Sequence, residues 1–207
     1  MSRLRIDAVP DPLQDQPEDL NQAMRLLARA EYTGLANFDP NRPLSTAHDW
    51  NAALEEIRAR LAAQYVATES TLHGLTIQTS AAIRAVNEAV EMSPMPDGEW
   101  SPMRAVLGDD LLAELCALSP ASIRRYAARE RLTPDDVAGR LHSVSLVVSD
   151  LAGSYNDYGI RRWFSRQRPQ LDGQSPLALL SGGFDPDGRS AGQVRDLAAS
   201  LSGSGAA

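Results

Sequence analysis

Residues 132–155 read LTPDDVAGRLHSVSLVVSDLAGSY, and this stretch decides the fold class of the chain. Its large apolar residues recur at alternating steps of four and three positions, which places them on one face of an α-helix; they are Val137, Leu141, Val144, Val148 and Leu151. A helix start precedes them, with Thr133 as the cap, Pro134 at the first helical position and Asp136 at the third. We therefore expect one long helix that forms the spine of its domain.

Three more helices are expected in the first hundred residues, where apolar residues again recur at helical spacing and alternating β-branched runs are missing. The first helix spans about 17–32. The second follows a capping box of Thr46 and Asp49, and its apolar stripe consists of Trp50, Leu54, Ile57 and Leu61. The third spans about 70–91 with near-heptad spacing, which leaves core packing and pairing with a second copy as alternatives.

A change in composition marks a domain boundary after these helices. Residues 92–103 read MSPMPDGEWSPM, and a stretch this rich in proline, glycine and serine is typical of a linker. We therefore predict an all-α protein with a helical region of unknown role over residues 1–100. A helix-turn-helix domain is expected over residues 104–155, and a small helical unit over residues 156–201.

Composition and charge restrict the class of protein. The chain has 207 residues, 43% of them hydrophobic, and a formal net charge of −7. It contains no apolar run long enough to span a membrane, no secretory signal and a single cysteine, so we expect a soluble cytoplasmic protein with no membrane partner. All 20 basic residues are arginine, and residues 119–168 hold nine of them against five acidic residues. This basic island in an acidic chain hints at an anionic partner.

Residues 109–131, DDLLAELCALSPASIRRYAARER, are typical of two short helices joined by a tight turn. Ser119 is suited to cap the second helix with Pro120 at its first position, and Leu118 to pack on Ile123. An arginine-rich second helix is the layout that enters a major groove, and the expected DNA contacts are Ser119, Ser122, Arg124, Arg125 and Arg129. The alternative is an ordinary corner of two helices whose arginines are a solvated face.

Two sequence motifs lie near the carboxyl end. Residues 159–164 read GIRRWF, and residues 171–180 read LDGQSPLALL, with Ser175 as a helix cap and Pro176 at the first helical position. A tryptophan beside arginines can be an interface anchor, a base-stacking platform or part of a core. We favour the core for Trp163, and Arg161 and Arg162 as the contact residues.

These motifs resemble the toxin-binding domain of antitoxins of the Xre/MbcA/ParS type. That domain reads A-R-x-W-[LF], then L-x-G-x-[ST]-P-x-x-L-L, then a short final helix. The resemblance covers roughly residues 105–201, and the matching positions are Gly159, Arg161, Trp163, Phe164, Leu171, Gly173, Ser175, Pro176, Leu179 and Leu180. Two features depart from the family: an insertion around residues 181–192, and the first hundred residues, which suggest an added function.

The resemblance implies an antitoxin that binds a cognate toxin and represses its own promoter through the helix-turn-helix. The usual toxin carries a RES domain that consumes NAD, so NAD belongs to the partner and this chain needs no cofactor. The implied toxin-binding residues are Arg161, Arg162, Trp163, Gly173, Ser175, Pro176, Leu177 and Leu180. A homodimer is also expected.

Catalytic and metal-binding patterns are missing from the sequence. His48, His73 and His142 fit no ligand spacing, Cys116 has no second thiol, and DPDG at residues 185–188 reads as a turn, so we expect neither an enzyme nor a metal protein. One alternative to the antitoxin is a stand-alone DNA-binding regulator or architectural protein without a toxin. A second is an adaptor whose amino-terminal helices bind another protein.

Overall fold

The computed structural model describes residues 4–11, 13–64 and 80–202, and most of these are helical. The described residues hold no β-strand, only an isolated bridge between Ile6 and Leu44, so the all-α prediction is confirmed. They form two compact units, which meet in the sequence between Ser93 and Pro94. We call residues 2–31 and 35–93 the amino-terminal unit, and residues 94–207, with the short segment 32–34, the carboxyl-terminal unit.

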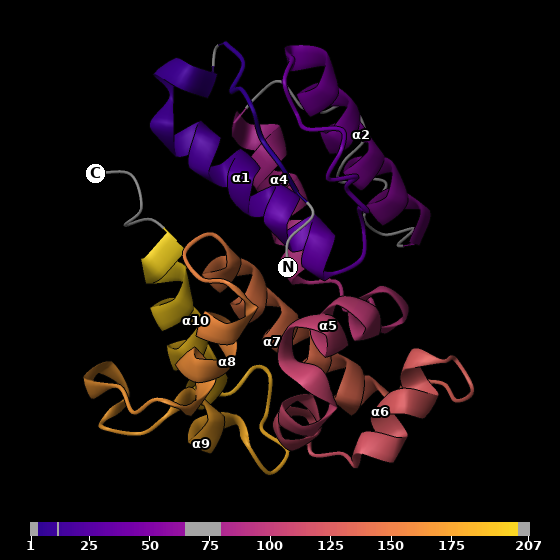
Figure 1. The fold of residues 1–207 in the computed structure, drawn as a ribbon, viewed down its shortest axis with the longest axis vertical. Helices are drawn as coiled ribbons and strands as arrows, with labels where there is room; N and C mark the ends of the chain where they lie inside the picture. The colour runs from indigo at the N-terminus through magenta and orange to yellow at the C-terminus, as the bar shows by residue number, and fades with distance from the viewer. Residues whose placement is uncertain (1–3, 12, 65–79, 203–207) are drawn as a thin grey trace. The chain divides into compact units, whose positions relative to one another are not determined.

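The amino-terminal unit contains α1 (Pro17–Tyr32), α2 (Ala47–Gln64) and α4 (Ser80–Glu91), after a short 3-10 helix, Leu13–Asp15 (Figure 1). The bounds of α1 and the capping box before α2 are confirmed. The backbone N–H of Asp49 donates to Thr46 Oγ1 over 3.2 Å, and the N–H of Thr46 donates to Asp49 Oδ2 over 2.9 Å. The predicted stripe of α2 is buried. The third predicted helix is confirmed over α4, and its remaining part lies outside the described residues.

A buried arginine joins two helices of this unit. Arg29 of α1 is 4% exposed, and its Nη2 lies 2.5 Å from Glu91 Oε1 of α4. Asn87, also on α4, donates from Nδ2 to the carbonyl of Gln22 over 2.9 Å. Burial of an arginine is favourable only when its charge and its N–H groups are met by partners. These contacts therefore fix the pairing of α1 with α4.

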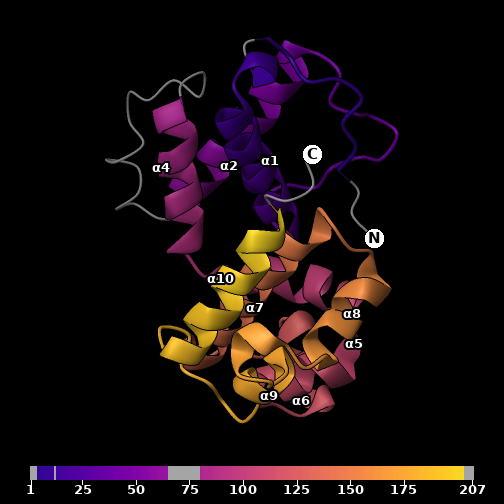
Figure 2. The same ribbon diagram turned by 90° about the vertical axis from the view of Figure 1, so that its left-hand side faces the viewer.

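The carboxyl-terminal unit contains α5 (Pro96–Cys116), α6 (Pro120–Ala127), α7 (Asp135–Ala152), α8 (Asp157–Ser165), α9 (Pro176–Leu180) and α10 (Arg189–Ser202), with a 3-10 turn at Pro169–Leu171. α7 packs against α5, α8 and α10, and the two ribbon views show it between its neighbours (Figures 1 and 2). Every residue from Leu141 to Leu151 is buried. The predicted spine helix is thus confirmed, and it is covered on all sides, not along one stripe only.

The predicted linker over residues 92–103 was wrong from Pro96 onward, because α5 begins there. Pro96 occupies the first turn, where its missing N–H breaks no helical bond. Trp100 and Met103 are fully buried in the core, and this burial outweighs the low helix propensity of the stretch. The helix breaks instead at Gly108, with φ 78° and ψ 164°, and its second part opens at Asp109 as predicted.

The start of α7 also differs from the prediction. Pro134 is the cap residue, and no side chain caps the helix. The hydroxyl of Thr133 instead accepts a hydrogen bond from Nε1 of Trp100 over 3.0 Å. Thr133 therefore supplies the hydrogen-bond acceptor for the buried indole N–H of Trp100, which has no water to bond.

Polar side chains lie inside the contact between α5 and α7. Glu99 of α5 is fully buried, and its Oε1 lies 2.5 Å from His142 Nδ1 of α7. Ser145 donates from Oγ to the same carboxylate oxygen over 3.2 Å. Directional contacts of this kind are satisfied in one register only. They therefore fix how α5 lies along α7.

Cys116, the single cysteine, is expected to be unreactive in the native protein. Its side chain has no solvent exposure, and burial raises the pKa of the thiol to about 12, with a further contribution from Glu99. Because the thiolate is the nucleophile, we expect no reaction with Ellman's reagent at neutral pH and one equivalent of reaction in denaturant. Rapid labelling of the folded protein would contradict the burial of Cys116.

Candidate DNA and protein interfaces

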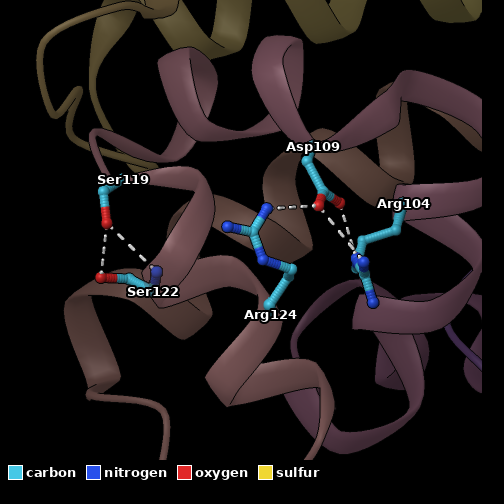
Figure 3. A network of polar contacts seen from close by, with 5 residues as sticks. All are labelled: Arg104, Asp109, Ser119, Ser122 and Arg124. Carbon is cyan, nitrogen blue, oxygen red and sulfur yellow. Dashed lines mark hydrogen bonds and ion pairs between the residues drawn. The ribbon is translucent and has the colours of Figure 1, made fainter.

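α6 begins with the predicted cap. The hydroxyl of Ser119 accepts a hydrogen bond from the backbone N–H of Ser122 over 3.1 Å, and the two hydroxyls lie 3.0 Å apart (Figure 3). Pro120 occupies the first turn, and Ile123 and Tyr126 face the core. The hydroxyls of Ser119 and Ser122 therefore hold the start of the helix. As DNA contacts, these two residues stay a prediction.

Arg124 is tied to the preceding helix by Asp109, a contact that the sequence did not predict. Asp109 lies between two guanidinium groups: Arg104 Nε at 2.7 Å and Arg124 Nη1 at 3.2 Å (Figure 3). The Arg104 hydrogen bond, followed by that of Arg124, holds the pKa of Asp109 below its usual value. One carboxylate thus offsets part of the charge of Arg104 and of Arg124, and only Arg124 belongs to the predicted DNA contacts.

The other arginines near α6 differ in their surroundings. Arg125 is exposed on the helix, and its side chain has no ion pair with any described residue. Arg131 lies over the ring of Tyr126, with 5.7 Å between its Cζ and the ring centroid, which keeps its charge near the same face.

The expectation that Arg129 projects from the second helix was wrong, since α6 ends at Ala127. The N–H groups of Arg129 and Glu130 bond the carbonyls of Tyr126 and Arg125, which is a Schellman motif, and Arg129 takes the left-handed conformation with φ 57°. Its side chain lies 3.8 Å from Asp97, and both groups are exposed. The motif ends the helix before Arg129 and directs this residue away from the row of Arg124 and Arg125.

Trp163 belongs to the core of the carboxyl-terminal unit, as the sequence analysis favoured. Its side chain is 1% exposed and meets Phe164 edge to face, with ring centroids 5.4 Å apart. The two neighbouring arginines separate. Arg161 is half-buried and donates from Nη1 to the carbonyl of Val106 on α5, whereas Arg162 is exposed; as contact residues, both stay predictions.

The turn between α8 and α9 is built as the second motif predicts. Ser175 caps α9 by accepting from the N–H of Ala178 over 3.1 Å, and Pro176 occupies the first turn and is buried. Asp172 and Gly173 both take positive φ, at 53° and 79°. The backbone N–H of Arg168 donates to the carbonyl of Gln174, and the carbonyl of Arg168 accepts from the N–H of Gly173. These two hydrogen bonds close the loop.

The motif residues that were expected to bind the toxin divide by burial. Trp163, Pro176 and Leu180 are buried, Leu177 and Ser175 are half-buried, and Gly173 is exposed. The buried members hold the shape of the unit, and a partner can touch only the others. The insertion after Leu180 also packs on the unit: Phe184 is buried, and Pro186 approaches Gly139 of α7 so closely that a Cβ there would lie 3.1 Å from its Cγ.

Comparison with protein-family models, with curated proteins and with solved structures finds no match for this chain. Across the described residues, no group of histidine, cysteine, aspartate and glutamate side chains could hold a metal ion. No helix in the described ranges is long and apolar enough to cross a bilayer. The likeness to the antitoxins therefore rests on the motif residues.

Replacing Trp163 by alanine is expected to lower the free energy of unfolding by about 3–5 kcal/mol, because the change leaves a large cavity in the core. Tyr158→Ala is the matched control, since Tyr158 lies on the same helix with 64% exposure and should change stability by less than about 0.5 kcal/mol. Urea unfolding followed by circular dichroism measures both. Equal effects would contradict the core position of Trp163.

Asp109→Asn is expected to destabilise the protein at neutral pH and progressively less in acid. The pKa of Asp109 is lowered in the folded state, so the carboxylate stabilises the fold above the unfolded pKa of about 3.9, and this contribution is lost as pH falls through the folded pKa. Unfolding free energies of both proteins at several pH values measure the difference. A difference independent of pH would contradict the ion pairs with Arg104 and Arg124.

Proposed function

We propose that this chain is an antitoxin whose carboxyl-terminal unit binds and neutralises a toxin protein. The observation that carries the proposal is the joint placement of the motif residues. Trp163, Phe164, Leu171 and Leu180 share one core and Pro176 is buried, while Arg162 of the same motif lies exposed on α8. A motif that builds a rigid support and leaves an arginine at its surface is suited to protein recognition.

The surface of α8 has the composition of an interface. Tyr158 and Arg162 lie one helical turn apart, and both are exposed. Tyrosine and arginine are enriched among the residues that dominate binding energy, because each brings a large apolar surface together with a polar group. The proposed partner is a RES-type toxin, with NAD as a ligand of the toxin.

DNA binding through α6 is the second part of the proposal. One support is the tight turn that joins α6 to the second part of α5, which begins at Asp109. The other is that Arg125 and Arg131 have no acidic partner among the described residues. Because Asp109 already offsets Arg124, we expect weak, salt-sensitive binding. A stand-alone DNA-binding regulator is the alternative, favoured by this same cluster of arginines.

The test of toxin binding is co-expression of this chain with the product of the neighbouring reading frame. We expect the two proteins to copurify and growth to be rescued. Arg162→Ala should weaken the complex about tenfold, as loss of a charge-assisted contact does. Arg189→Ala is the control, because Arg189 is exposed and lies outside the α8 surface. If neither copurification nor rescue occurs, the antitoxin proposal is wrong.

DNA binding is tested on a duplex from the upstream region of the gene. Arg124→Ala with Arg125→Ala should flatten the slope of log K against log salt by about 1–2, and Asp109→Asn should steepen it by about 1–2 because two arginines are released. Fluorescence anisotropy over a salt series measures these slopes. Unchanged slopes in folded variants would exclude α6 as the DNA-binding element.

A further inference from the structure

The arginines of the chain differ in whether an acidic residue neutralises them. In the amino-terminal unit, Arg58 and Arg60 pair with Glu55 and Glu56, and the buried Arg29 pairs with Glu91. Around α6, Arg124 and Arg129 face Asp109 and Asp97. At the end of α8 and in the following loop, no arginine has an ion pair with a described residue, as is also the case for Arg125 and Arg131 near α6; the arginines of this region are Arg161, Arg162, Arg166 and Arg168.

Arg161 donates to the carbonyl of Val106, so we take the other three residues, which make no such contact within the described residues, as the surface for a partner. We call Arg162, Arg166 and Arg168 the α8 arginine cluster. They occupy the last turn of α8, its cap position and the closed loop behind it. In a chain of net charge −7, a concentration of unneutralised arginine attracts an anionic partner specifically to this site.

Arg168 is held in a fixed position. Its backbone N–H donates to the carbonyl of Gln174 over 2.9 Å, and its own carbonyl accepts from Gly173 over 3.0 Å. Its guanidinium lies over the ring of Trp163, with 5.3 Å between Cζ and the ring centroid. The ring covers one face of the guanidinium and Nε is buried, so the two Nη groups are the part of Arg168 that is left for the two oxygens of a carboxylate.

Two hydrogen-bond donors at this place have no acceptor. Nε1 of Trp163 and Nε of Arg168 are both buried and lack a hydrogen-bond partner in the structure. A buried donor without an acceptor costs free energy, and native structures rarely retain one without a reason. Both donors belong to the stacked pair of Trp163 and Arg168, so this pair is not fully hydrogen-bonded within the unit, and a partner can reach it only at the Nη groups of Arg168.

We propose that the α8 arginine cluster binds an acidic segment of the partner protein, with one carboxylate held by Arg168 on its Trp163 support. This inference rests on the proposed toxin binding and adds the chemistry of the partner's surface. A short peptide segment fits better than a nucleic acid. Arg168 has given one face to Trp163, so this face is not available to stack on a base.

The first experiment measures binding of the neighbouring gene product to three variants of the full chain. Arg162→Gln, Arg166→Gln and Arg168→Gln together should weaken the complex about 100-fold and flatten its salt dependence. The control removes the same charge elsewhere, through Arg42→Gln, Arg84→Gln and Arg125→Gln, and should change the affinity less than about threefold. Arg168→Lys, which keeps the charge but loses the paired N–H edge, should weaken it about tenfold. Wild-type affinity in the triple cluster variant overturns the inference.

The second experiment separates this inference from the proposed function. A fluorescent octaglutamate peptide should bind the wild-type chain at low salt with a Kd of about 1 mM or below, and the triple cluster variant should abolish that binding. If octaglutamate binds through the cluster while the gene product does not, the antitoxin proposal fails and the acidic-segment inference stands. If octaglutamate does not bind, or a single-stranded oligonucleotide of equal charge binds the cluster more tightly, the inference is overturned.

Discussion

The burial of α7 on all sides is the constraint on which the carboxyl-terminal unit depends. A helix whose residues from Leu141 to Leu151 are all buried needs neighbours on every face, and α5, α8 and α10 supply them. Glu99 then fixes the register of α5 on α7 through His142 and Ser145. The helix that carries the predicted DNA contacts and the helix that carries the predicted toxin contacts are therefore parts of one hydrophobic core.

Local signals in the sequence were sufficient for most elements. The capping box of Thr46 and Asp49, and the serine caps at Ser119 and Ser175, act within three residues of themselves, so their spacing alone predicts where helices begin. The same holds for the apolar periodicity of α7. The start of α5 could not be predicted in this way, because the composition of residues 92–103 is that of a linker and only the burial of Trp100 and Met103 makes part of it helical.

The sequence predicted which residue types form the candidate interfaces, but not which of these side chains are already engaged in contacts within the chain. The sequence shows that arginines cluster at α6 and α8, yet it does not show that Asp109 holds Arg124 or that Arg161 bonds a carbonyl of α5. These contacts join residues 15 and 55 positions apart. Sequence spacing carries no information about such pairs, so the division of the arginines into neutralised and free groups emerges only from the fold.

Because α5 begins at Pro96, the segment that can be transferred to another protein by gene fusion must begin earlier than the predicted domain boundary. Trp100 stacks on Tyr126, with 5.7 Å between ring centroids, and Glu99 reaches α7, so the residues just after Pro94 are part of the core. A gene fusion that transferred only residues 104–201 to another protein would leave both partners of these contacts without support. The unit that evolution can move as a whole includes the residues from Pro94 onward together with residues 32–34, and Tyr32 lies in its core, so the first 93 residues cannot be lost as one separate module.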